Sequence, residues 1–207
     1  AKSTRAFVKR LDAHVPLAKT IQDNPITELP REVHKKGDHT GDCDAKPLLK
    51  AALAGNDVGL VSEAGMPAVA DPGSSVVRAA HALGLKVVPL VGPVSLLLAL
   101  AASGLNGQNF AFVGYLPQDG TARTQRLREL ENLAQKTGQT QLFIETPYRN
   151  QALWEALVNG LQGNTRLARV SGLTLPSMQV HSQTVQAWRS AGKTHISGEP
   201  TVFLIGK

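Results

Sequence analysis

The chain has 207 residues, of which 42% are hydrophobic, 18% charged and 4% aromatic. That apolar fraction can build the core of one large domain or two small ones, and it excludes a wholly disordered chain. The single cysteine, Cys43, excludes a disulfide framework and any multi-cysteine zinc or iron–sulfur site, and it favours a reducing compartment such as the cytoplasm. No Gly-x-Gly pair and no Walker A sequence occurs, so the common dinucleotide and nucleoside triphosphate motifs are excluded.

The formal net charge of +6 favours polyanionic partners, of which RNA is the commonest in the cytosol, although many soluble enzymes are equally basic. The chain begins Ala-Lys-Ser, without an initiator methionine or a signal-peptide pattern. No charged residue occurs from Val87 to Gln118, a stretch long enough to cross a membrane. Its proline and glycine residues instead predict a buried strand, a turn, a buried helix and a loop, so we expect no membrane span.

The first half of the chain is predicted to alternate helices and strands. We expect a helix over Ala1–Asp12, then a polar loop over residues 13–44 with room for one short strand around Leu17–Ile21. The elements expected after it are a helix over Leu48–Ala54, a strand over Asp57–Ser62, a helix from Asp71-Pro72 to Gly84, a strand over Lys86–Leu90, a helix over Pro93–Ala102 and a strand over Asn109–Tyr115.

A break at Leu116–Gly120 precedes the second half. The elements expected there are a charged helix over residues 122–136, a strand over 141–145, a helix over 148–159 and strands over 166–170, 178–182 and 201–205. This alternation predicts an α/β protein of two α/β domains, with a mainly parallel sheet in the N-terminal domain and a mixed sheet in the C-terminal one. We place the domains at residues 1–115 and 121–207, with residues 116–120 as the linker.

Two loops follow consecutive predicted strands, where open parallel sheets bind their ligands. In the first, Glu63 could accept hydrogen bonds from an amine or a ribose, and Gly65 would let a ligand approach the backbone. The second runs from Gly92 to Ser95. The alternative interpretation of each loop is an ordinary connection between a strand and a helix.

Six runs occur in order over Val61–Asn150: VSEAGMPAVADPG, VRAA, VVPLVGP, ALAASGL, FAFVGYLP and FIETPYRN. They resemble the tetrapyrrole methylase superfamily of S-adenosylmethionine (SAM)-dependent methyltransferases. Within it they are most similar to the bacterial branch that methylates a cytidine ribose 2′-hydroxyl in small-subunit ribosomal RNA. The resemblance implies two α/β domains with SAM in the cleft between them, usually in a homodimer. The family opens with a strand that precedes Ala1, so this chain is expected to lack it.

The resemblance also implies residue roles. Cofactor contacts carry over to Glu63, Ala64, Gly65, Met66, Pro67, Gly92, Pro93, Ser95, Thr146 and Thr201, and more loosely to Pro147, Leu173, Thr174 and Pro200. Substrate contacts are expected from Arg5, Tyr148 and Arg149.

Methyl transfer to a hydroxyl gains from a nearby base, for which Glu63 and Glu145 are the candidates. Arg149 could hold a phosphate or a carboxylate, and Tyr148 could stack on a base. The alternatives are an ion pair between Glu145 and Arg149 at the start of a helix, and a partly buried core tyrosine.

The substrate half departs from the rRNA branch. Lys2-Ser3 replace an acidic pair, no His-Glu-His-Asn motif occurs among Asn24–Asp44, and Val170–Thr174 replace a charged motif. The leading hypothesis is a divergent paralogue that transfers methyl from SAM to RNA. The alternatives are methylation of a tetrapyrrole or another small molecule, and a SAM- or RNA-binding protein without catalysis.

Two polar clusters complete the sequence-based candidates. His34, His39 and Cys43 lie among aspartates at spacings that permit a metal, but the stretch is also typical of a solvated loop, and we expect no metal. Three arginines of the helix after the linker could bind phosphates or form a solvated helix face: Arg123, Arg126 and Arg128.

Overall fold

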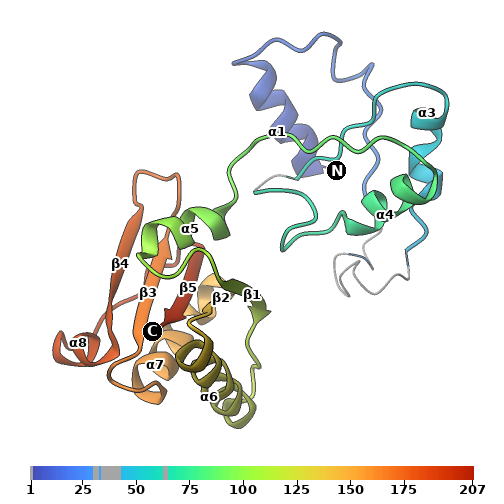
Figure 1. Cartoon of the computed structure of the whole chain (residues 1–207). Helices are drawn as coiled ribbons and strands as arrows, with labels where there is room; N and C mark the ends of the chain where they lie inside the picture. Colours follow the sequence, from blue (N-terminus) through green and yellow to red (C-terminus); the bar gives the residue numbers. More distant parts are fainter. Residues whose placement is uncertain (1, 30–32, 34–42, 63–64) are drawn as a thin grey trace. The chain divides into compact units, whose positions relative to one another are not determined.

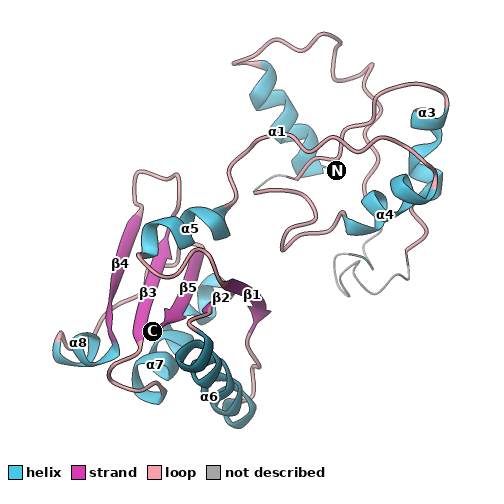
Figure 2. Ribbon diagram, in the orientation of Figure 1, coloured by secondary structure: helices cyan, strands magenta, loops and turns pink. Residues whose placement is uncertain are grey.

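The computed structural model describes residues 2–29, 33, 43–62 and 65–207, and side chains from Arg5 onward within these ranges. The chain forms two compact units, Ala1–Pro93 and Val94–Lys207, each with its own core. Figure 1 traces the chain in colours from blue to red, and Figure 2 separates helices from strands. Each unit is described by itself.

The second unit is built on a five-stranded sheet (Figure 2). Its strands are β1 (Phe110–Tyr115), β2 (Thr140–Ile144), β3 (Arg166–Ser171), β4 (Gln179–Thr184) and β5 (Thr201–Gly206), in the spatial order β1-β2-β5-β3-β4. β1 and β2 are parallel, whereas β5 is antiparallel to β2 and β3, and β4 is antiparallel to β3. The predicted mixed sheet is therefore confirmed, and each of its strands overlaps a strand expected from the sequence.

Helices cover both faces of this sheet. They are α5 (Ser95–Ser103), α6 (Gly120–Thr137), α7 (Asn150–Gly160) and α8 (Val185–Ser190), and the 3-10 turn η2 (Pro147–Arg149) precedes α7. Alternation along β5 divides the core: Phe203 and Ile205 pack with apolar side chains of α6, α7 and α8, whereas Val202 and Leu204 pack with those of α5. All of β5 is buried, as expected for a central strand with helices on both sides.

The long helix α6 has clear local start and stop signals. Asp119 is its N-cap, and its Oδ1 accepts a hydrogen bond from the backbone N–H of Ala122 at 2.8 Å. Gly138 ends the helix in the left-handed conformation, with φ of 69°, which costs glycine little. The helix predicted over residues 122–136 is confirmed.

The first unit holds α1 (Lys2–Asp12), the 3-10 turn η1 (Lys46–Leu49), α3 (Lys50–Leu53) and α4 (Ser74–Ala82). Its core is small and joins α4 to the η1 region: Ala45, Leu49, Val76, Ala79 and Ala80 are buried together. The expected helices are present, but α4 begins after Gly73 rather than at Asp71-Pro72. Asp71 accepts a hydrogen bond from the Ser62 hydroxyl instead of capping the helix.

Three predicted strands are absent from the described residues of this unit. Residues 57–62 and 86–90 have no regular secondary structure and pair with no described strand, and residues 17–21 include bends and a turn. Val88 and Leu90 are 59% and 80% exposed. An apolar run remains a strand only where a neighbouring strand pairs with it, and these segments pair with no described strand. Among the residues that the structure describes, the expected parallel sheet therefore does not form in this unit, and the remaining strand expected in it, β1, pairs with β2.

The compact units divide between Pro93 and Val94, and residues 116–120 join β1 to α6 within the second unit. The domain boundary at the predicted linker stays a prediction. The uncharged stretch from Val87 onward contains α5 and β1. Within the described parts of the chain, no helix has the length and apolarity needed to cross a bilayer.

Candidate functional site

Polar residues gather at one edge of the sheet in the second unit. β2 and β3 both end at this edge, and β5 begins there, because Ile144 pairs with Val202 and Ser171 pairs with Thr201. We define the edge cluster as the residues that continue from these strand ends: Glu145 to Asn150, Ser171 to Thr174, and Glu199 to Thr201. The cluster contains the second-half residues predicted for the cofactor, including Thr146 and Thr201.

Glu145 holds the first turn after β2 in place. Its Oε1 accepts hydrogen bonds from the backbone N–H of Thr146 at 2.7 Å and from the Thr146 hydroxyl at 3.2 Å. The same oxygen accepts from Nε and Nη2 of Arg149 at 3.0 and 2.8 Å. These bonds satisfy one oxygen of a carboxylate that is largely buried. The ion pair predicted as one alternative is therefore present, with a buried carboxylate and a half-exposed guanidinium.

Tyr148 lies on the surface beside this pair. It is 80% exposed, and the guanidinium carbon of Arg149 lies 5.3 Å from the centre of its ring. The interpretation of Tyr148 as a partly buried core residue is wrong. Hydrogen bonding to the Glu145 carboxylate raises the pKa of Arg149, so this arginine is a permanent cation next to an accessible aromatic ring.

The start of β5 carries buried hydroxyl and amide groups. Thr201 is buried, and its Oγ1 lies 2.9 Å from Ser171 Oγ and 2.9 Å from the carbonyl oxygen of Glu199, to which it donates. Asn150 Nδ2 donates to the same carbonyl at 3.1 Å. The Oδ1 atom of Asn150 is buried and has no hydrogen-bond partner among the described residues.

The loop after β3 is strained. Gly172 and Thr174 have φ of 59° and 69°, and a positive φ is unfavourable for a β-branched residue such as Thr174. The backbone N–H of Gly172 donates to the carbonyl of Pro200 at 3.0 Å, which ties the loop to the start of β5. Backbone strain of this kind persists where the surrounding structure enforces it, often at a binding site.

Ser95, at the amino end of α5, is another residue of this unit that was predicted to contact the cofactor. Val94 is the N-cap, and its side chain packs against the same core cluster as Ile144 and Leu173. Ser95, the first residue of α5, is exposed.

The other predicted cofactor residues belong to the first unit. Glu63 and Ala64 lie outside the described residues, so the role of Glu63 as a base stays a prediction. Gly65 has φ of 76°, and a Cβ built on it would meet nothing within 4 Å. Met66 and Pro67 are half-buried, and the backbone N–H of Val69 donates to the carbonyl of Met66 at 3.2 Å.

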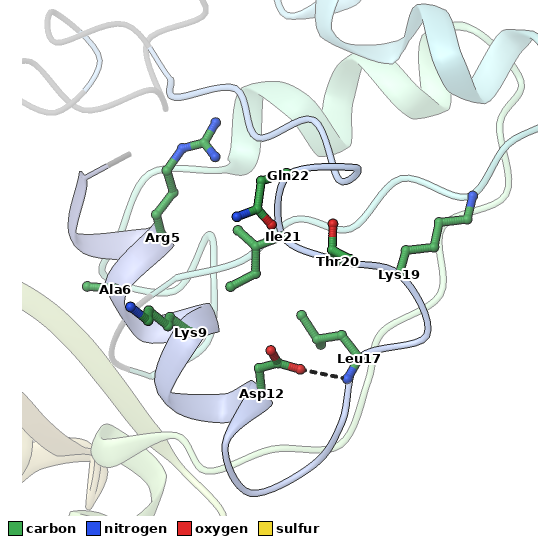
Figure 3. Close-up of a pocket in the computed structure, with 9 residues that line it drawn as sticks. All are labelled: Arg5, Ala6, Lys9, Asp12, Leu17, Lys19, Thr20, Ile21 and Gln22. Atoms are coloured by element: carbon green, nitrogen blue, oxygen red, sulfur yellow. Dashed lines mark hydrogen bonds between the residues drawn. The ribbon is translucent and has the colours of Figure 1, made fainter.

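Gly92 and Pro93 are exposed, and the space around the Cα of Gly92 is also open. Arg5 lies exposed on α1 and lines a cavity between this helix and residues 17–22 (Figure 3). Of the described first-unit candidates, Arg5, Gly65, Gly92 and Pro93 are thus accessible to a ligand.

The two polar clusters have different outcomes. Residues 34–42, with both histidines of the possible metal site, lie outside the described residues; among those described, no group of three His, Cys, Asp or Glu could hold a metal. On α6, Arg126 pairs with Glu129 at 3.1 Å, and Arg123 donates to the carbonyl of Gln118 at 3.3 Å. These contacts favour the solvated helix face over a phosphate site.

Sequence reasoning missed Asn150, Ser171 and Glu199. Asn150 is the last residue of the FIETPYRN run, so the sequence placed it next to the predicted site residues. The sequence did not show that its side chain is buried. The contacts of Ser171 and Glu199 depend on the pairing of β3 with β5, which no local pattern reveals.

Comparisons with known proteins identify the family of the chain. The family model described as Tetrapyrrole (Corrin/Porphyrin) Methylases matches residues 6–187. The ribosomal RNA small subunit methyltransferase I of Vibrio cholerae is 36% identical over 66% of this chain and 46% of its own length. The enzyme of the same name from Haemophilus influenzae is 37% identical, over 82% of this chain and 60% of its own length.

The chain spans about half the length of the curated relatives it matches. Among solved structures, the methyltransferase CobJ superposes with a TM-score of 0.52 at 21% identity, covering 79% of this chain and 70% of CobJ. That likeness concerns the fold alone.

Proposed function

Because the chain belongs to the tetrapyrrole (corrin/porphyrin) methylase family, we propose that it is a SAM-dependent methyltransferase. We propose RNA as the acceptor, at a ribose 2′-hydroxyl. The observation that carries the proposal is the family match over residues 6–187, which includes the two parts of the edge cluster that follow β2 and β3. The names of the curated relatives and the net charge of +6 support the choice of RNA.

The residues of the chain suit SAM. Its adenine and ammonium groups need hydrogen-bond acceptors, and the edge cluster offers the buried Oδ1 of Asn150. The unpartnered Oδ1 of Asn150 supports a ligand donor at this edge. The open space at Gly65 supports close approach of a ligand to the backbone of the first unit.

The methyl group on the sulfonium of SAM is electrophilic, so most of the rate acceleration can come from positioning. Glu145 acts as a positioning residue rather than as the base, since its Oε1 already accepts from Thr146 and Arg149. Arg149 and Tyr148 bind the acceptor, the arginine through a phosphate and the tyrosine by stacking on a base. Glu63 remains the proposed base.

We propose that the protein works as a homodimer, as the resemblance implies, and in the cytoplasm, as its single cysteine favours. Light scattering during size-exclusion chromatography gives the mass of the assembly. A mass of one chain at all concentrations contradicts the homodimer.

Titration with SAM and with its demethylated product, S-adenosylhomocysteine, tests the cofactor. We expect binding of both by calorimetry. Gly65→Leu should weaken binding more than about tenfold, because the side chain enters the space proposed for the cofactor. Gly55→Leu is the matched control: Gly55 has φ of 85° and open space around its Cα, but it lies outside the proposed site.

Equal affinities of the two variants would remove the Gly65 loop from the site. Transfer of labelled methyl then distinguishes the acceptors. Label in RNA supports the proposal, and label only in small molecules of the tetrapyrrole class supports the first alternative. Cofactor binding without transfer to either pool supports the binding protein without catalysis.

A further inference from the structure

A basic cavity lies between α1 and residues 17–22 of the first unit (Figure 3). Its volume is about 470 Å³, within the usual range for ligand sites. The residues that line it are Arg5, Ala6, Lys9, Asp12, Leu17, Lys19, Thr20, Ile21 and Gln22. We refer to it as the α1 cavity.

Cations surround this cavity. Arg5 and Lys9 are four residues apart on α1 and so lie on one face of the helix, and Lys19 comes from the loop. All three side chains are exposed. Two like charges at this spacing repel one another, and a bound anion would relieve that repulsion.

The carboxylates near the cavity are already engaged. Asp12 Oδ1 accepts from the backbone N–H of Leu17 at 2.9 Å, the bond drawn in Figure 3, and this bond ties the loop to the end of the helix. Asp23 Oδ2 accepts from the Thr20 hydroxyl at 2.7 Å. Arg5, Lys9 and Lys19 line the cavity with Asp12 as the one carboxylate, so the lining carries a net charge of +2.

The floor of the cavity is apolar. Leu17 and Ile21 are half-buried, and Figure 3 shows their side chains between the helix and the loop. An apolar floor with a cationic rim suits a nucleotide, whose sugar and base lie on the floor while its phosphates meet the rim. Free inorganic phosphate would use the rim alone.

We propose that the α1 cavity binds the sugar–phosphate backbone of single-stranded RNA. The choice of RNA rests on the proposed function. In this role Arg5, Lys9 and Lys19 contact phosphates and contribute affinity without sequence preference.

The salt dependence of RNA binding tests the proposal. A short fluorescein-labelled single-stranded RNA of mixed sequence is titrated with the full chain by fluorescence anisotropy at several salt concentrations. Lys9→Gln with Lys19→Gln removes two phosphate contacts, so affinity should fall about tenfold and the slope of log K against log salt by about 1.4.

Arg10→Gln is the matched control, since Arg10 is exposed on the same helix but does not line the cavity. Its slope should fall by much less than that of the double variant. The affinity for SAM should not change in any variant, which shows that the fold is retained.

An unchanged slope in the double variant, or an equal fall with Arg10→Gln, overturns the α1 cavity proposal. If the wild-type chain transfers methyl to RNA in that case, the proposed function stands without it. If the wild-type chain binds no RNA, the cavity proposal and the RNA acceptor fall together, while SAM binding still tests the methyltransferase assignment.

Discussion

Arg169 is a buried cation without a carboxylate partner among the described residues. It is 6% exposed, and its guanidinium carbon lies 5.7 and 5.8 Å from the ring centres of Trp154 and Trp188. Its Nη1 donates only a long bond of 3.4 Å, to the carbonyl of His195, and its Nε is buried without a partner. Burial lowers the pKa of Arg169. The two indole rings therefore provide most of what stabilises this charge.

Replacement of Arg169 tests that interpretation. Arg169→Met keeps a long side chain and removes the buried charge, so the free energy of unfolding should stay the same or rise by about 1 kcal/mol. Arg169→Lys should lower it by about 1–2 kcal/mol, because an ammonium is more strongly hydrated and does not stack on both rings. Urea denaturation measures both. A loss of more than about 2 kcal/mol in the Met variant would show that the cation is a net stabiliser.

At the residue scale, the sequence predicted which residues lie near one another better than it predicted their burial and hydrogen bonds. Thr146 and Thr201 were expected in one site, and pairing of β2 and β3 with β5 brings both to one sheet edge. Glu145 was one of two candidate bases; the sequence did not reveal that its Oε1 accepts from Thr146 and Arg149, and its role as a base stays untested. Exposure and hydrogen bonding depend on neighbours distant in the sequence, so Tyr148 was misjudged and Asn150 was missed.

At the element scale, the start of α6 depends on one side chain. Asp119→Ala removes the hydrogen bond to the N–H of Ala122 and should lower the free energy of unfolding by about 1 kcal/mol. Asp119→Asn keeps a good capping side chain and should lower it by only a few tenths of a kcal/mol. Thermal unfolding followed by circular dichroism compares them. Equal losses in both variants would indicate that the charge near the helix dipole, rather than the cap, is what stabilises this end.

Elements with strong local signals were predicted well. α6 has a cap, an amphipathic pattern and a terminal glycine, and each strand of the second unit is an apolar or alternating run between turn residues. The six-residue helix α8 was missed because it is too short for its periodicity to be seen. The runs at residues 57–62 and 86–90 have the composition of strands, but composition does not supply the neighbouring strand that a sheet requires.

At the scale of the whole molecule, the division into units predicts which fragments fold. A fragment of residues 94–207 keeps α5 and β1, so it should unfold cooperatively in urea. A fragment of residues 121–207 lacks both and uncovers the sheet face formed by Leu142, Val202 and their neighbours. It should bind the dye ANS and lose its cooperative transition. Cooperative folding of the shorter fragment would instead support the domain boundary predicted at residues 116–120.

The position of β5 also sets the order in which the second unit can assemble. β5 follows every other strand in the chain, yet it lies between β2 and β3 and pairs with both. During translation β2 and β3 emerge first, each with a free edge facing the gap that β5 later fills. The nascent chain on the ribosome is therefore exposed to wrong strand pairing until β5 has been made. Chaperones that shield strand edges should matter most in that interval.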